Sequence, residues 1–152
     1  MINAGLLFAL ASLIAVTAIV VSFKQLIGDV QNRLSESPEL TQDMLRQEFT
    51  RFFIKVAIVE ALPILLIVLG FVQIGGQEGT FTLMEVLPSM VIVAILLAVG
   101  IFNVFIARQD TISLGSFSTQ TKTMINTVCM IGLSLISAIP IVSFVALLTM
   151  MK

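Results

Sequence analysis

Long apolar stretches separated by short polar segments dominate the chain. Residues 4–23, 86–107 and 124–151 contain no charged side chain, and residues 52–72 contain only Lys55 and Glu60. A helix needs about 20 apolar residues to cross a bilayer, and its backbone groups must be paired there. The alternation typical of barrel strands is missing. The pattern therefore predicts an all-α membrane protein with four transmembrane helices, near residues 3–34, 38–74, 83–112 and 119–151.

Composition and charge support a lipid environment. Hydrophobic residues make up 58% of the chain, charged residues 11%, and the mean hydropathy is +1.11. Soluble domains carry about 25% charged residues, so the lipid bilayer is the expected partner. The net charge of −1 gives no indication of nucleic-acid binding. There is no histidine and a single cysteine, Cys129, which we expect to be a small core residue. We therefore expect no metal, no cofactor and no enzymatic activity.

The cations are distributed unevenly between the polar segments. Seven of the eight lie in or beside the first segment, residues 24–51, or flank the third, residues 108–123: Lys24, Arg33, Arg46, Arg51, Lys55, Arg108 and Lys122. The one exception is Lys152 at the C-terminus. The second segment, residues 73–85, has none. Because lysine and arginine stay on the cytoplasmic side, loops 24–51 and 108–123 are expected in the cytoplasm and both termini outside. The expected location is the cell (inner) membrane.

The first stretch is expected to remain in the mature protein. A signal peptide has a positively charged start and a shorter apolar core. Here the first three residues are uncharged, and the first cation, Lys24, follows the stretch. A retained helix is the better interpretation.

The first polar segment is itself expected to be mostly helical. Leu26, Val30 and Leu34 recur at helical spacing, while Ser37 and Pro38 suit an N-cap and a first helical position. The sequence thus predicts two long helices that project beyond the membrane, with a turn near residues 35–37. The acidic side chains of this segment are expected in solvent: Asp29, Glu36, Glu39, Asp43 and Glu48.

The two halves of the chain resemble each other. Residues 59–64, Val-Glu-Ala-Leu-Pro-Ile, align with residues 136–141, Ile-Ser-Ala-Ile-Pro-Ile, at an offset of 77. Each half then contains a helix, a cation-flanked loop, and a second helix that contains a proline. This predicts two helical hairpins, residues 1–76 and 77–152, the first extended into the cytoplasm.

Glu60 is the residue most indicative of function. Carboxylates within a membrane span are rare, unfavourable and usually functional. Apolar surroundings disfavour the charged form of a carboxyl, which suits a group that binds a proton and releases it beside water or a cation. Lys55 lies elsewhere on the helix and nearer its cytoplasmic end. The structural alternative is a carboxyl that pairs with Lys55 or Asn103.

Other polar residues and prolines could support Glu60. By depth in their spans, Thr17, Asn103 and Ser134 are possible hydrogen-bond partners, although such residues more often join helices together. Pro63, one turn beyond Glu60, is expected to free a backbone carbonyl and to kink the helix, as Pro140 would in the fourth span.

The run from Phe53 to Ile64 resembles the second helix of subunit c, the proteolipid of rotary ATP synthases, which carries its ion-binding carboxylate in a similar segment. Residues 37–40, Ser-Pro-Glu-Leu, and 107–110, Ala-Arg-Gln-Asp, resemble its polar loop. The resemblance implies a divergent, duplicated four-helix proteolipid, like those of vacuolar-type ATPases. Glu60 would be its proton-binding carboxylate, and Ser137 would stand where a second one is missing.

The resemblance implies a proton-translocating membrane subunit that forms a homo-oligomer and works with other subunits of a rotary ATPase. Two alternatives remain open. One is a non-transporting membrane scaffold or assembly protein with a degenerate proteolipid fold. The other is a small proton-coupled transporter, which the absence of Trp and Tyr disfavours because cation sites use aromatic faces.

Overall fold

A computed structural model describes residues 4–36, 42–76, 81–115 and 117–151. These residues form four helices and no strand: α1 (Ala4–Glu36), α2 (Gln42–Gly75), α3 (Leu83–Ser113) and α4 (Thr119–Thr149). All four are long and apolar enough to cross a membrane. The prediction of an all-α, multi-pass integral membrane protein is therefore confirmed at this level. The described part of α1 ends at Glu36, within the turn expected near residues 35–37. The Ser37–Pro38 start signal lies among residues 37–41, outside the described part.

Side-chain hydrogen bonds mark the starts of α3 and α4. The start of α4 is fixed by Ser118, whose hydroxyl accepts a hydrogen bond from the Thr121 backbone N–H at 3.2 Å. At the start of α3, Glu85 accepts one from the Thr82 backbone N–H at 2.9 Å.

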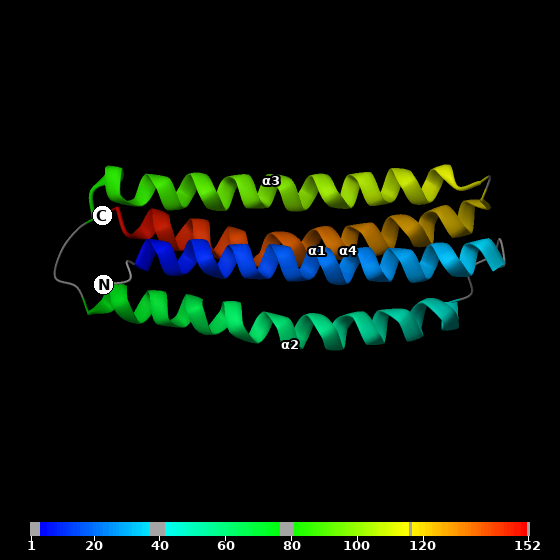
Figure 1. Cartoon of the computed structure of the whole chain (residues 1–152), viewed down its shortest axis with the longest axis horizontal. Helices are drawn as coiled ribbons and strands as arrows, with labels where there is room; N and C mark the ends of the chain where they lie inside the picture. The colour runs from blue at the N-terminus through cyan, green and yellow to red at the C-terminus, as the bar shows by residue number, and fades with distance from the viewer. Residues whose placement is uncertain (1–3, 37–41, 77–80, 116, 152) are drawn as a thin grey trace.

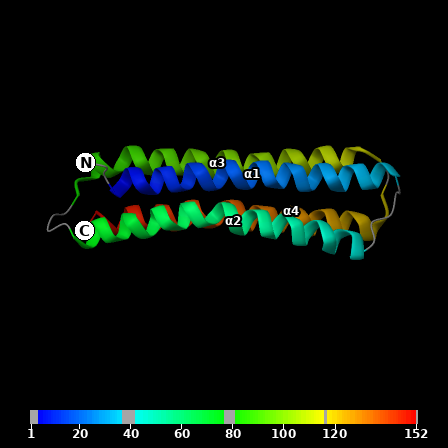
Figure 2. The ribbon, with the colours of Figure 1, turned by 60° about the horizontal axis from the view of Figure 1, so that its bottom comes forward.

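The four helices run side by side along the long axis of the bundle, and the most extensive contacts are those of α1 with α2 and of α3 with α4 (Figures 1 and 2). α1 packs against all three others, α2 touches α4 only slightly, and the described parts of α2 and α3 are not in contact. α1 begins and α4 ends at the same end of the bundle (Figure 1). With 31 to 34 residues, the helices are about 46–51 Å long, which exceeds the hydrocarbon core of a bilayer.

Small residues explain the central place of α1. Its buried face near the N-terminus carries only small side chains at many positions: Ala4, Gly5, Ala9, Ala11, Ser12 and Ala15. Small residues let neighbouring backbones approach closely, which is how membrane helices pack. The buried rings of Phe8 and Phe23 fill the remaining space against glycines of the partners, Gly70 of α2 and Gly132 of α4.

Candidate functional site

Glu60 lies beside the row of buried residues through which α2 packs against α1. Val56 and Pro63, about one turn before and one turn after it, are both buried. The next residues in sequence, Ala61 and Leu62, are exposed on the surface that would face lipid. Glu60 itself is half-buried. Its carboxyl therefore stands at the edge between the α1–α2 contact and the outer surface of the bundle.

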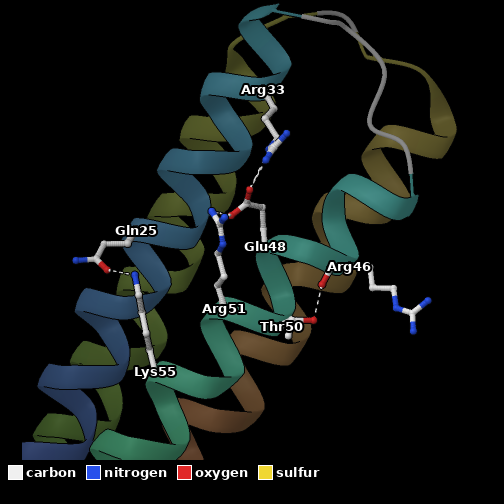
Figure 3. A network of polar contacts seen from close by, with 7 residues as sticks. All are labelled: Gln25, Arg33, Arg46, Glu48, Thr50, Arg51 and Lys55. Carbon is white, nitrogen blue, oxygen red and sulfur yellow. Dashed lines mark hydrogen bonds and ion pairs between the residues drawn. The ribbon is translucent and has the colours of Figure 1, made fainter.

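Two contacts fix what lies opposite Glu60 on α1. The Phe8 ring packs edge-on against Phe71, with ring centroids 5.4 Å apart. Nearer the other end, the Lys55 Nζ donates a hydrogen bond to the Gln25 Oε1 at 3.0 Å (Figure 3). In this antiparallel register, Glu60 is level with the turn of α1 around Ile19, which is fully buried and apolar. The residue of α1 at the level of the carboxyl is thus apolar and buried.

Glu60 makes no hydrogen bond and no ion pair with any residue that the structure describes. Lys55, the cation nearest in sequence, is engaged with Gln25 instead. An ionised carboxylate without a partner is strongly disfavoured in an apolar environment. The arrangement suits a carboxyl that is neutral in the membrane and becomes charged only beside water or a cation supplied from elsewhere.

Three of the four polar residues proposed from the sequence hydrogen-bond within their own helices. Asn103 donates to the Val99 carbonyl at 2.9 Å, and Ser134 donates to the Met130 carbonyl at 3.0 Å. Ser137 likewise turns back along α4, donating to the Leu133 carbonyl at 2.8 Å. Thr17 lies on the exposed stripe of α1. None of the four hydrogen-bonds to Glu60, so a supporting role for them stays a prediction.

Pro63 and Pro140 both lie inside their helices and are buried. Proline has no backbone N–H, so the carbonyls four residues earlier, those of Val59 and Ile136, lack their usual helical donor. The Val59 carbonyl directly precedes Glu60 in sequence. A free carbonyl in lipid is itself a hydrogen-bond acceptor that a protonated carboxyl or a water molecule can use.

The expectation that Glu48 is in solvent is wrong. Its side chain is 5% exposed and forms an ion pair with Arg33 of α1, with Arg51 at 4.0 Å from its second oxygen (Figure 3). Glu48 lies one turn before the buried Phe52 and two before the buried Val56, so it continues the stripe of α2 that faces α1. That spacing is the signal that could have identified it.

No cluster of His, Cys, Asp or Glu suited to a metal ion occurs among the described residues. Cys129 is buried in α4. Comparison of the chain with protein-family models, with curated proteins and with solved structures gives no match.

Proposed function

We propose that the protein is a proton-translocating membrane subunit that resembles the proteolipid of rotary ATPases. The observation that carries the proposal is Glu60, a carboxyl in the middle of an apolar helix, at the edge of the bundle and without a polar partner among the described residues. A structural carboxyl in lipid needs a partner to offset its desolvation. A carboxyl that carries protons instead needs a charged or polar partner that it meets only transiently.

In this mechanism Glu60 alternates between two states. While it faces lipid, the carboxyl holds a proton and is neutral, which avoids the penalty of a charge in hydrocarbon. When it meets a cation or water at a partner subunit, the charged form is stabilised and the proton leaves. The cation is expected from that partner, because Lys55 is already bonded to Gln25.

The internal repeat supports the proteolipid interpretation of the chain. Residues 59–64 align with residues 136–141 at an offset of 77, which places Ser137 at the position equivalent to Glu60. We infer two helical hairpins, the first projecting into the cytoplasm, with one titratable carboxyl per chain. With one carboxyl per chain, repeated proton transfer at a partner subunit requires several copies of the chain. We therefore infer a homo-oligomer that acts with other subunits of a rotary ATPase in the cell (inner) membrane.

The uneven distribution of cations leads to a topology that can be measured. In a Cys129→Ser background, a cysteine at Gly76 is expected to react with an impermeant thiol reagent added outside the cell. A cysteine at Gly115 is expected to react only after the inner face is exposed, since cation-flanked loops stay in the cytoplasm. Both glycines are exposed, so they form a matched pair. Labelling of Gly76→Cys from the inside alone would contradict this topology.

The size of the native assembly separates the proposal from its alternatives. A rotor subunit is expected to leave the membrane in mild detergent as a large, detergent-resistant homo-oligomer, measured by native mass spectrometry. A monomer or dimer would contradict the rotor interpretation. It would favour a scaffold, or less strongly a small proton-coupled transporter. The scaffold alternative draws on one observation, that Asn103, Ser134 and Ser137 bond to their own helices rather than to a shared site.

A further inference from the structure

Two cavities lie along the contact between α3 and α4, and we call them together the α3–α4 groove. One cavity of about 360 Å³ is lined by Phe105 and Arg108 of α3 and by Met130 and Leu133 of α4, among others. A second cavity of about 350 Å³ lies further along the same two helices, between Ile101 and Ile141. Apart from Arg108 and Asn126, the side chains that line the two cavities are apolar or, in Cys129, a thiol.

The two cavities lie on one face of α3. Their lining residues recur there at steps of three and four, at Ala94, Ala98, Ile101, Phe105 and Arg108, which is the spacing of one helical face. The distance along the helix from Ala94 to Arg108 is about 21 Å. That length is comparable to the depth of one leaflet, about half of the hydrocarbon core. The groove is therefore long enough for an acyl chain.

Arg108 lies at the end of the groove, where the apolar stretch of α3 ends. The Arg108 Nε donates a hydrogen bond to the Asn126 Oδ1 at 2.8 Å, which fixes the guanidinium between the two helices. Arg108 has no acidic partner in the part of the chain that the structure describes. Its terminal N–H groups remain free to donate, and a guanidinium binds the oxygens of a phosphate in pairs.

We propose that this groove binds an anionic phospholipid, with the headgroup phosphate on Arg108 and Asn126 and an acyl chain along α3. A zwitterionic headgroup brings its own cation, whereas an uncompensated arginine near the membrane surface favours a headgroup of net negative charge. A second groove, between α2 and α4, also contains an arginine, Arg46. That side chain is exposed and bonds to no side chain among the described residues (Figure 3), so it serves as a control.

The chain has no Trp and no Tyr, so a single introduced tryptophan reports on its own position. Phe105→Trp places the probe in the groove, one turn from Arg108. Phe102→Trp is the matched control, since Phe102 is 65% exposed on the same helix and lines neither cavity. Each variant is reconstituted in vesicles that contain a phosphatidylglycerol or a phosphatidylcholine brominated near the headgroup end of its acyl chains, and quenching is measured.

For Phe105→Trp we expect about a fivefold preference for the anionic lipid, and for Phe102→Trp about equal quenching by both lipids. The preference is expected to disappear in Phe105→Trp/Arg108→Gln and to persist in Phe105→Trp/Arg46→Gln. Equal quenching at Phe105→Trp, a preference that survives Arg108→Gln, or no quenching by either lipid would each overturn the proposal. The last result would mean that another copy of the chain covers the groove.

A second measurement keeps the proposal testable if the tryptophan variants fail to fold. Native mass spectrometry of the wild-type chain, released from membranes that contain both lipids, is expected to retain the anionic lipid preferentially. The Arg108→Gln variant is expected to lose that preference. If the wild-type chain and the Arg108→Gln variant retain the anionic lipid equally, the proposal is overturned.

Discussion

Replacement of Glu60 by glutamine is expected to abolish proton-linked flux while the helical bundle stays folded. Glutamine has nearly the same size and keeps hydrogen-bonding capacity, but it cannot bind and release a proton. Because Glu60 is half-buried and unpaired among the described residues, the substitution leaves no partner unsatisfied. We expect a change in the free energy of unfolding within about 0.5 kcal/mol.

The flux is measured with a pH-sensitive dye in membrane vesicles from cells whose only copy of the chain carries Glu60→Gln. Glu60→Asp is the control, since it keeps a carboxyl and is expected to retain measurable flux. Ser137→Ala, at the equivalent position of α4, is expected to retain most of the flux, because the serine hydroxyl is not the group that binds the proton. A Glu60→Gln variant with full flux would make Glu60 a packing residue and would favour the scaffold alternative.

The largest expected loss of stability comes from Gly132→Ala in α4. A methyl group at this position would lie 2.3 Å from the Phe23 Cε2 and 2.5 Å from its Cδ2, whereas carbon atoms pack at about 3.5–4.0 Å. Phe23 is 1% exposed, so its rigid ring has little room to move. The clash has to be relieved by separating α1 from α4. We expect the free energy of unfolding to fall by about 1–3 kcal/mol, measured by titrating SDS into detergent micelles.

Two variants test whether the Phe23 ring is the cause of that loss. Gly28→Ala, within α1, introduces a methyl group with no atom within 4 Å, and it is expected to stabilise the chain by about 0.5–1 kcal/mol through helix propensity. The double variant Phe23→Leu/Gly132→Ala is expected to lose less stability than the two single changes added together. Additive losses would show that the two residues do not interact.

The four helices could be predicted because their cause is local. An uncharged stretch long enough to cross a bilayer has to be helical, whatever surrounds it. The arrangement of the helices relative to one another has no such local cause. The helices are apolar on most sides, so periodicity does not say which face is buried. The signal that was present is composition, since the small residues from Ala4 to Ala15 favour α1 as the central helix.

Glu48 shows where reasoning from charge alone failed. A carboxylate outside the apolar stretches is usually solvated, but α1 and α2 remain in contact beyond those stretches, and Arg33 meets Glu48 there. Whether a charge is buried depends on the neighbouring helix, which the sequence of one helix does not contain. For Glu60 the position in an apolar span was evident from sequence. Its place level with the turn of α1 around Ile19, and the bonds of Asn103 and Ser137 to their own helices, required the structure.

Selective labelling by a hydrophobic carbodiimide tests the central claim most directly, because this reagent attacks protonated carboxyls that are reachable from lipid. At about pH 6.5, roughly two units above the ordinary pKa of a glutamate side chain, the reagent is expected to spare side chains exposed outside the apolar stretches, such as Asp29 and Asp43. Mass spectrometry of wild-type membranes is expected to find the adduct on Glu60, forming more slowly as the pH rises, and to find none there in Glu60→Gln. Absence of an adduct on Glu60, or equal labelling of Asp29, would contradict a proton-binding carboxyl in the membrane.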